Sequence, residues 1–434
     1  MTSFEGNVAT STGVDLRSPL RLPCGVVLPN RILKSAMTEG LADERDRPTP
    51  QHAALYRRWS EGGTGTLVTG NVMVDRRYLE RPGNVVLDGE ADDALLSAWA
   101  EAGVTAGNQL WMQINHPGRQ CTRFVASKPV APSAIQLEMG GLFGRPRALA
   151  EDEILDIVGR FAQTARAAQR TGFTGVQVHA AHGYLCSQFL SPRTNVRTDR
   201  WGGTLENRAL FLREVVRAVR REVGPSFPVA VKLNSADFQK GGFSLEESCQ
   251  VAAWLVEDGI DLLEISGGTY EQMTNFGVGH DSTISREAYF LDSAAALRSA
   301  VRVPLAITGG FRSRAAMSDA LQKGELDVIG IARPLCTDPS LSRKLLEGTV
   351  ADGRSDERHH RLGRGFFGPA SGIAAIRGIN AQAQTAWFYQ QILHLAAGQE
   401  PDLGLSVSSA LGGHLRRELG LSRARNAHAK RFMA

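Results

Sequence analysis

Short apolar segments rich in β-branched residues alternate along this chain with amphipathic segments, about eight times over roughly 330 residues. Apolar runs of this kind suit parallel strands buried on both faces, and the stretches between them suit covering helices. Eight alternations of strand and helix predict an α/β protein built as a closed (β/α)₈ (TIM) barrel. The predicted strands are 31–37, 66–71, 108–114, 174–179, 228–234, 261–266, 304–309 and 327–332.

An open, doubly wound sheet is the structural alternative. Such a sheet normally carries a glycine-rich nucleotide-binding turn after its first strand. Here the first predicted strand is followed by TEGLAD, which is not a turn of that type. The closed barrel is therefore favoured.

Three predicted helices have clear sequence signals. The stretch 151–171 repeats apolar residues at spacings of three and four, and Gly172 is expected to stop it. The stretch 244–259 opens with a serine followed three residues later by a glutamate, which is the spacing of a capping box. The third helix is predicted over 205–223.

Two regions depart from the simple alternation. Residues 115–150 form a long insertion after the third strand, interrupted by prolines, of the kind that serves as a lid or binding loop. Within the region after the eighth unit, 374–397 is predicted to be helical. We therefore expect a barrel domain over 16–350 and a helical C-terminal extension, 351–434, packed on it.

The extension contains three consecutive aromatic residues, Trp387, Phe388 and Tyr389. Aromatic side chains of this kind either anchor contacts between subunits or pack on the barrel of their own chain. The sequence leaves both alternatives open, so a homo-oligomer is an allowed state and not a required one.

Composition restricts the functional classes. The net charge of +4 is small for this length, and no concentrated basic block predicts nucleic-acid binding. The five cysteines are widely spaced without a CxxC pair, which argues against disulfides, structural zinc and iron–sulfur clusters. The N-terminus lacks an apolar signal core, and no apolar stretch has the length of a membrane span. These features predict a cytoplasmic protein without a membrane or nucleic-acid partner.

Function in a barrel collects at the C-terminal ends of the strands. Polar residues stand at those ends: Thr38, Gln113, His179, His182, Lys232 and Arg333. The two histidines, with Tyr184 close behind, are the most informative group. Imidazoles three residues apart could bind a metal, although no HExxH pattern accompanies them. They could equally donate hydrogen bonds to a carbonyl oxygen, with Tyr184 as a general acid.

Several segments carry a resemblance to a known family. The stretch HAAHGYLCSQFLSPRTNVRTDRWGGTLENR, together with LPNRILKSAMTEG, QINHPGR, ITGGFRS and GIARPL, resembles the old yellow enzyme family of FMN-dependent NAD(P)H:flavin oxidoreductases. The resemblance covers about residues 16–350. It implies FMN as cofactor, NADH or NADPH as hydride donor, and a small-molecule substrate.

The resemblance also implies residue roles. His179 and His182 are similar to the pair that holds the electron-withdrawing oxygen of the substrate, and Tyr184 to the proton donor for its α-carbon. Thr38 occupies the position whose side chain contacts the flavin carbonyl, where many relatives have Cys. Other positions match contacts to the isoalloxazine ring, namely main-chain groups of Ala36, Met37 and Gly70 and the side-chain amide of Gln113.

Lys232 stands where most relatives carry Arg. It keeps the positive charge that would stabilise the reduced pyrimidine ring, but it lacks the bidentate fork of Arg. The phosphate is expected at the ends of the seventh and eighth strands, where barrels commonly bind phosphate. The expected phosphate contacts come from Gly309, Gly310, Ala332 and Arg333.

Three departures from relatives qualify the resemblance. The chain has neither the clustered cysteines nor the GxGxxG segment of relatives with a dinucleotide-binding half, so a single flavin is expected. Gly40 stands where some relatives place a substrate-contacting Tyr, which leaves the substrate undetermined.

The reaction that the resemblance implies is reduction of an activated C=C bond in a ping-pong cycle. The alternatives are NADH oxidase or demethylase chemistry on the same barrel, or flavin binding without turnover.

Overall fold

Eight parallel strands close into a ring in the computed structural model, which describes residues 13–89, 92–137, 141–267, 291–363 and 365–433. The strand order is β3-β4-β6-β9-β10-β11-β12-β13, and β13 pairs with β3 to close the barrel. The predicted (β/α)₈ barrel is confirmed. The strands are β3 (Ile32–Lys34), β4 (Thr66–Met73), β6 (Gln109–Asn115), β9 (Gly175–Ala180), β10 (Val229–Asn234), β11 (Leu262–Ser266), β12 (Leu305–Thr308) and β13 (Val328–Ile331).

Helices cover the outside of the ring, and the three predicted ones form where their sequence signals stand. Helix α3 buries its apolar stripe against the strands and ends just before Gly172, whose φ of +93° suits glycine. Helix α6 begins with the predicted capping box of Ser244 and Glu247. The covering helices are α1 (Pro50–Glu61), α2 (Asp93–Gly103), α3 (Glu151–Arg170), α4 (Leu185–Leu190), α5 (Leu205–Val223), α6 (Leu245–Glu257), α8 (Leu291–Ala300), α9 (Arg314–Gln322), α10 (Pro334–Thr337) and α11 (Leu341–Glu347).

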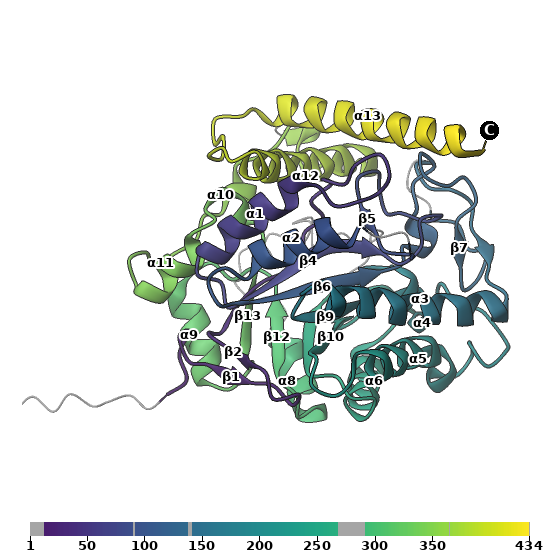
Figure 1. Cartoon of the computed structure of the whole chain (residues 1–434), viewed down its shortest axis with the longest axis horizontal. Helices are drawn as coiled ribbons and strands as arrows, with labels where there is room; N and C mark the ends of the chain where they lie inside the picture. Colours follow the sequence, from purple (N-terminus) through teal and green to yellow (C-terminus); the bar gives the residue numbers. More distant parts are fainter. Residues whose placement is uncertain (1–12, 90–91, 138–140, 268–290, 364, 434) are drawn as a thin grey trace, which may run out of the picture.

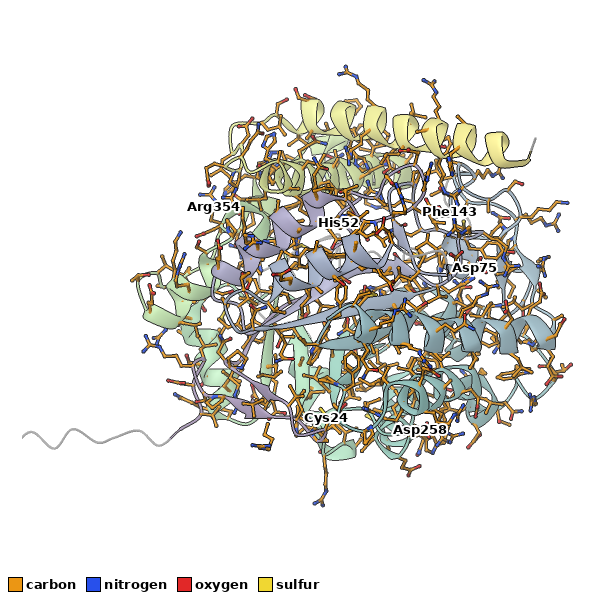
Figure 2. The ribbon with its side chains drawn as sticks, in the orientation of Figure 1. Cys24, His52, Asp75, Phe143, Asp258 and Arg354 are labelled. Carbon is orange, nitrogen blue, oxygen red and sulfur yellow. The ribbon has the colours of Figure 1, made fainter. Side chains whose placement is uncertain are left out.

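A short antiparallel hairpin, β1 (Leu20–Arg21) and β2 (Val27–Leu28), closes the N-terminal end of the barrel. The backbone N–H of Cys24 in its turn donates to Asp261 at the start of β11, and Figure 2 shows Cys24 at the lower edge of the molecule. The hairpin packs on the inward-facing residues of the strands to form an apolar bottom layer. Its buried members are Leu22, Leu28, Leu33, Val68, Trp111, Ala230, Leu262, Ala306 and Val328.

The described residues of the insertion after β6 form short regular elements, namely the 3₁₀ turn η1 (Gly118–Gln120) and the strand pair β7 (Val130–Ala131) and β8 (Arg147–Ala148). Earlier in the chain, the short strand β5 (Val85–Val86) lies beside β4. Figure 2 places Phe143 of the insertion and Asp75 of the loop after β4 in the half of the molecule away from Cys24. Insertion and hairpin therefore lie at different ends of the barrel.

The C-terminal extension is helical, as predicted, and carries two long helices, α12 (Ala374–Ala396) and α13 (Val407–Met433), that run side by side over the barrel (Figure 1). Trp387 is fully buried and stacks on His360 at 3.8 Å between ring centroids. The aromatic cluster thus packs within its own chain. Helix α13 reaches the loops at the barrel rim: Arg417 donates to the carbonyl of Gly40, and Arg425 pairs with Asp46.

No helix in the part of the chain that the structure describes is long and apolar enough to cross a membrane. All five cysteines are free thiols, and three of them, Cys121, Cys186 and Cys336, are buried. Among the described residues, no group of three or more His, Cys, Asp or Glu side chains is arranged to hold a metal ion.

Candidate functional site

A layer of polar side chains crosses the barrel interior directly above the apolar bottom layer. Residues two apart on a strand face the same side of the sheet. Each polar residue of this layer therefore stands two positions after an apolar residue that also points into the barrel. Four of the five residues are buried and one is half-buried; four lie on the strands β6, β10, β11 and β12, and the fifth directly follows β3. The layer consists of Ser35, Gln113, Lys232, Glu264 and Thr308.

Glu264 is the centre of this layer and is completely buried. Its Oε1 lies 2.9 Å from the ammonium of Lys232 and accepts from Ser35 and Thr308 at 2.5 and 2.6 Å. Its Oε2 accepts from Gln177 at 2.7 Å. Burial alone would raise the pKa of Glu264, but the Lys232 ammonium and these hydrogen bonds lower it below its ordinary value. The carboxylate is therefore charged at neutral pH and compensates Lys232.

A bulge in β4 adds a polar residue that regular alternation does not predict. The register between β4 and β6 shifts between Val68 and Asn71, so Asn71 stands opposite Gln113. Bulges of this kind re-aim a side chain and are common beside active sites. The Nδ2 of Asn71 donates to Tyr184 at 3.4 Å and to Glu80 at 2.6 Å. Asn71 therefore links the tyrosine to a carboxylate.

Glu80 also joins the residue after the first strand to this group. The hydroxyl of Thr38 donates to the Oε2 of Glu80 at 3.0 Å. A hydroxyl has one proton, so Thr38 offers lone pairs and no donor to other neighbours while this bond is made. The side chain of Thr38 is buried, four residues after the end of β3.

The aromatic triad of His179, His182 and Tyr184 forms at the end of β9, as its spacing suggests. The ring of His179 lies 5.1 Å from that of His182 and 4.8 Å from that of Tyr184, both nearly edge to face. Burial, followed by the nearby His182 and Lys232, holds the pKa of His179 well below its ordinary value. Its Nδ1 accepts from the backbone N–H of Ala181 at 3.3 Å, so the proton of the neutral ring is on Nε2.

His182 is held in an unusual backbone conformation. Its φ of +61° is rare for a residue with a side chain, and such strain persists only where neighbours enforce it. Its N–H donates to Asn234, and its carbonyl accepts from Gln120. The ring Nε2 lies 2.8 Å from the hydroxyl of Ser266, and burial lowers the pKa of His182 to about 3. Its ring is therefore neutral, with Nδ1 as the nitrogen not bonded to Ser266.

The predicted phosphate residues meet at one rim because β12 and β13 are neighbours. Thr308 pairs in register with Gly330, so the residues that follow each strand emerge together. Gly310 has a φ of +84°, which glycine adopts without strain. The guanidinium of Arg333 is half-buried and makes no hydrogen bond or ion pair with the residues that the structure describes. An anion is the natural partner for such a cation.

The backbone after β3 packs tightly against Gly70. The N–H of Gly70 donates to Glu39 at 2.8 Å, and Glu39 also accepts from the hydroxyl of Tyr56. A Cβ on Gly70 would lie 2.2 Å from a Glu39 oxygen and 2.5 Å from the carbonyl of Met37. Ala36 and Met37 are half-buried on this segment, so Gly70 and the residues after β3 form one wall.

We expect Gly70→Ala to lower the free energy of unfolding by about 1–3 kcal/mol, because the added methyl group forces a backbone shift in a packed wall. Gly159→Ala on α3 is the matched control, since no atom lies within 4 Å of its added Cβ, and it should stabilise by about 0.5–1 kcal/mol. Urea denaturation of both variants measures the difference. Equal stabilities would contradict the packing argument.

The residues of the site offer what a flavin mononucleotide requires. Arg333 supplies an uncompensated cation for a phosphate, and Lys232 and Gln113 supply a cation and an amide in the polar layer. The Oδ1 of Asn71 is buried without a hydrogen-bond partner among the described residues, although such atoms are normally paired. Together these groups can bind a phosphate and make hydrogen bonds with a polar ring, so the residues of the site fit FMN.

Sequence reasoning missed three acidic residues and two amides of this site, one of them that of Gln177. Asn71 is hidden by the bulge, and Glu264 stands in an apolar strand without a motif. Glu39 and Glu80 lie in loops after different strands, and only the fold brings them to Gly70 and Thr38. A lone acid inside the buried run LLEIS was the one signal available, because a fully buried carboxylate needs a partner.

Comparison with known proteins gives a consistent family. The sequence model of the NADH:flavin oxidoreductase / NADH oxidase family matches residues 15–352. The chain is 41% identical over 353 residues to the NADH-dependent flavin oxidoreductase iliE of Hypocrea jecorina (strain QM6a). That alignment covers 76% of this chain and 88% of the relative.

Two solved structures are similar over the barrel. A complex of 2-naphthoyl-CoA reductase with 2-naphthoyl-CoA superposes with a TM-score of 0.73 at 28% identity, covering 77% of this chain and 52% of that one. The old yellow enzyme homologue from Zymomonas mobilis superposes with a TM-score of 0.66 at 25% identity, covering 78% and 94%. This chain thus spans about half of the first protein and nearly all of the second.

Proposed function

The chain belongs to the NADH:flavin oxidoreductase / NADH oxidase family, and from that premise we propose that it reduces an activated C=C bond of an enone-type acceptor with electrons from NADH or NADPH. It is an oxidoreductase of the old yellow enzyme type, with FMN as its cofactor. The observation that carries the specific proposal is the triad, in which two neutral imidazoles and a phenol stand together at one strand end.

The proposed cofactor site extends from the polar layer to the phosphate rim. Gln113 and Lys232 would hold the pyrimidine edge of FMN, Thr38 and the wall of Ala36, Met37 and Gly70 would flank the ring, and its phosphate would bind at the rim. When bound, FMN supplies the redox chemistry, taking a hydride from the nicotinamide and passing it to the acceptor. The rim residues are Gly309, Gly310, Ala332 and Arg333.

The histidines bind the acceptor in this proposal. The Nε2–H of His179 donates to the acceptor oxygen, because its Nδ1 is occupied by the N–H of Ala181. His182 would contribute through Nδ1, since its Nε2 is bonded to Ser266. A hydrogen bond to that oxygen stabilises the negative charge that develops there when the β-carbon is reduced.

Tyr184 delivers the proton to the α-carbon. Its hydroxyl oxygen accepts from Asn71. A phenol keeps its proton at neutral pH and can act as a general acid. The ring is buried against His179, which fixes its direction and excludes water. Nicotinamide and acceptor would occupy the same place in turn, which gives a ping-pong cycle.

A half-reaction experiment tests this function. Protein reconstituted with FMN and reduced anaerobically by NADH is mixed with a cyclic enone, and flavin reoxidation is followed by stopped-flow absorbance. We expect the enone to reoxidise the protein and to yield the saturated ketone. Reoxidation by oxygen with none by any enone would support NADH oxidase chemistry on this barrel instead, and failure of NAD(P)H to reduce the flavin would indicate a binding protein.

Arg333→Gln should weaken FMN binding by roughly tenfold or more, because a charge-assisted contact to a phosphate is lost. Riboflavin, which lacks the phosphate, should bind the variant and the native protein equally. Arg302→Gln, at an exposed site one turn of chain before β12, is the control and should leave both affinities unchanged. Fluorescence titration gives these constants, and an equal loss for riboflavin and FMN would argue against a phosphate contact.

We also propose a cytoplasmic location. The support is the set of five free thiols, which suits a reducing compartment. Imaging of a fluorescent fusion in the source cells tests it, and a signal confined to an organelle would contradict it.

A further inference from the structure

We infer that Glu264 is a positioning residue of the cofactor site, which sets both the charge and the hydrogen-bond direction that the polar layer presents to the flavin. The inference rests on the proposed function, because it takes Lys232 and Gln113 as contacts of the pyrimidine edge. Glu264 itself is fully buried in the same layer, where it contacts protein groups among the described residues, and it acts through these neighbours.

The charge argument starts from the ion pair. The Nζ of Lys232 lies 2.9 Å from Glu264 and 2.9 Å from the hydroxyl of Ser35, and both charged side chains are buried. Among the five side chains of the layer, the carboxylate of Glu264 offsets the positive charge of Lys232. Lys232 therefore offers the flavin a compensated cation, and it stabilises a reduced, negatively charged pyrimidine ring less than an isolated cation would.

The direction argument follows the amides. A charged carboxylate only accepts hydrogen bonds, so Glu264 requires the NH₂ group of Gln177 to face it, at 2.7 Å. The carbonyl of Gln177 must then face Gln113, whose Nε2 donates to it at 2.8 Å. Gln113 is left with its carbonyl turned away from Gln177, as an acceptor for a ring N–H. One carboxylate thus orients two amides that would otherwise be able to flip.

The surrounding contacts hold Glu264 in one place. Thr308 donates to it from β12, and Gly330 on β13 leaves room for that side chain, since a Cβ there would lie 1.8 Å from the Thr308 hydroxyl. Lys232 pairs in register with His179 on the neighbouring strand. The same layer therefore supports both the proposed contacts to the flavin and the histidine that would bind the acceptor.

The test uses the full-length protein reconstituted with FMN and compares the native protein with Glu264→Gln, Lys232→Met and the double variant. The readout is the midpoint potential of the bound FMN. Glu264→Gln leaves Lys232 uncompensated and should favour binding of reduced over oxidised FMN by tenfold or more, which raises the potential by about 30 mV for a two-electron couple. In the Lys232→Met background the same substitution should change that preference less than about twofold.

A second variant tests the direction of the amides and remains informative if Glu264→Gln does not fold. Gln177→Leu keeps the ion pair and removes only the link to Gln113, so FMN should bind at least about fivefold more weakly. Glu101→Gln, at an exposed position of α2, is the control and should change neither affinity nor potential.

Two results would overturn the inference. One is a potential that Glu264→Gln shifts equally with and without Lys232, or does not shift at all. The other is FMN affinity unchanged in Gln177→Leu. Either result in a native protein that binds FMN leaves the proposed function intact, whereas a native protein without FMN affinity defeats the proposed function itself.

Discussion

Replacing Tyr184 by Phe is expected to slow the reaction of the reduced protein with an enone by about 10²- to 10⁴-fold, the usual contribution of a positioned general acid. Reduction of the flavin by NADH should stay unchanged, because no proton from Tyr184 is needed there. The ring of the variant keeps its packing against His179, so the fold is expected to persist.

Stopped-flow measurement of the two half-reactions checks this expectation. Tyr389→Phe is the matched control, because that phenol lies on α12 with its ring stacked on His414. The control should leave both half-reactions at their native rates. Equal losses in both halves for Tyr184→Phe would show that the phenol serves binding or structure and not proton delivery.

Acid should destabilise the fold strongly below about pH 6.5, because four buried histidines and the half-buried His182 are held in neutral form. Burial lowers the pKa of His52, His182 and His414 to about 3 and that of His116 to about 4, and it holds the pKa of His179 well below its ordinary value. In the unfolded chain each titrates near 6.5.

The sign follows from proton binding. Above about pH 6.5 neither state binds these protons, so the stability is fully present; below it only the unfolded state binds them, and stability falls until the folded pKa is reached. Each histidine contributes about 1.4 kcal/mol per pH unit in the window between its unfolded and folded pKa. Five together should remove roughly 5 kcal/mol between about pH 6.5 and 5.5.

Urea denaturation across this pH range measures the loss. His414→Phe keeps the stacking on Tyr389 and removes one titrating ring, so its stability should fall less steeply with acid by about one fifth. His359→Gln, at an exposed position, should follow the native curve. Stability that holds constant between about pH 6.5 and 5.5 would contradict burial of these rings in neutral form.

The strands were predictable from sequence because parallel strands buried on both faces are mostly apolar. Seven of the eight observed strands begin and end within two residues of a predicted segment, as β10 (Val229–Asn234) does for 228–234, whereas β3 ends three residues before the end of the predicted segment 31–37. Helix ends were predictable where a cap residue stands, as at Ser244 of α6. Local chemistry decides both features, so no knowledge of the fold was needed.

The acidic half of the site could not be predicted in the same way. Glu80 meets Thr38 only because two loops converge, and Glu264 meets Lys232 only because β10 and β11 are neighbours in register. Asn71 faces Gln113 because of a bulge, which breaks the period of two without leaving a sequence mark. Such juxtapositions depend on the closed barrel and appear only once it is built.

The placement of α13 was also beyond sequence. A helical extension was predicted, but neither the bounds of α13 nor its contacts with Gly40 and Asp46 were, and those contacts join residues more than 370 positions apart. Helix α13 therefore lies beside Gly40, the position at which some relatives have a substrate-contacting Tyr.

The central claim is that the barrel holds FMN above the polar layer, beside the triad of His179, His182 and Tyr184. The most direct measurement is the visible spectrum of the purified protein supplied with FMN, before and after anaerobic addition of NADH. The account predicts a bound yellow chromophore that NADH bleaches. A protein that stays colourless after dialysis and takes up no FMN would contradict it.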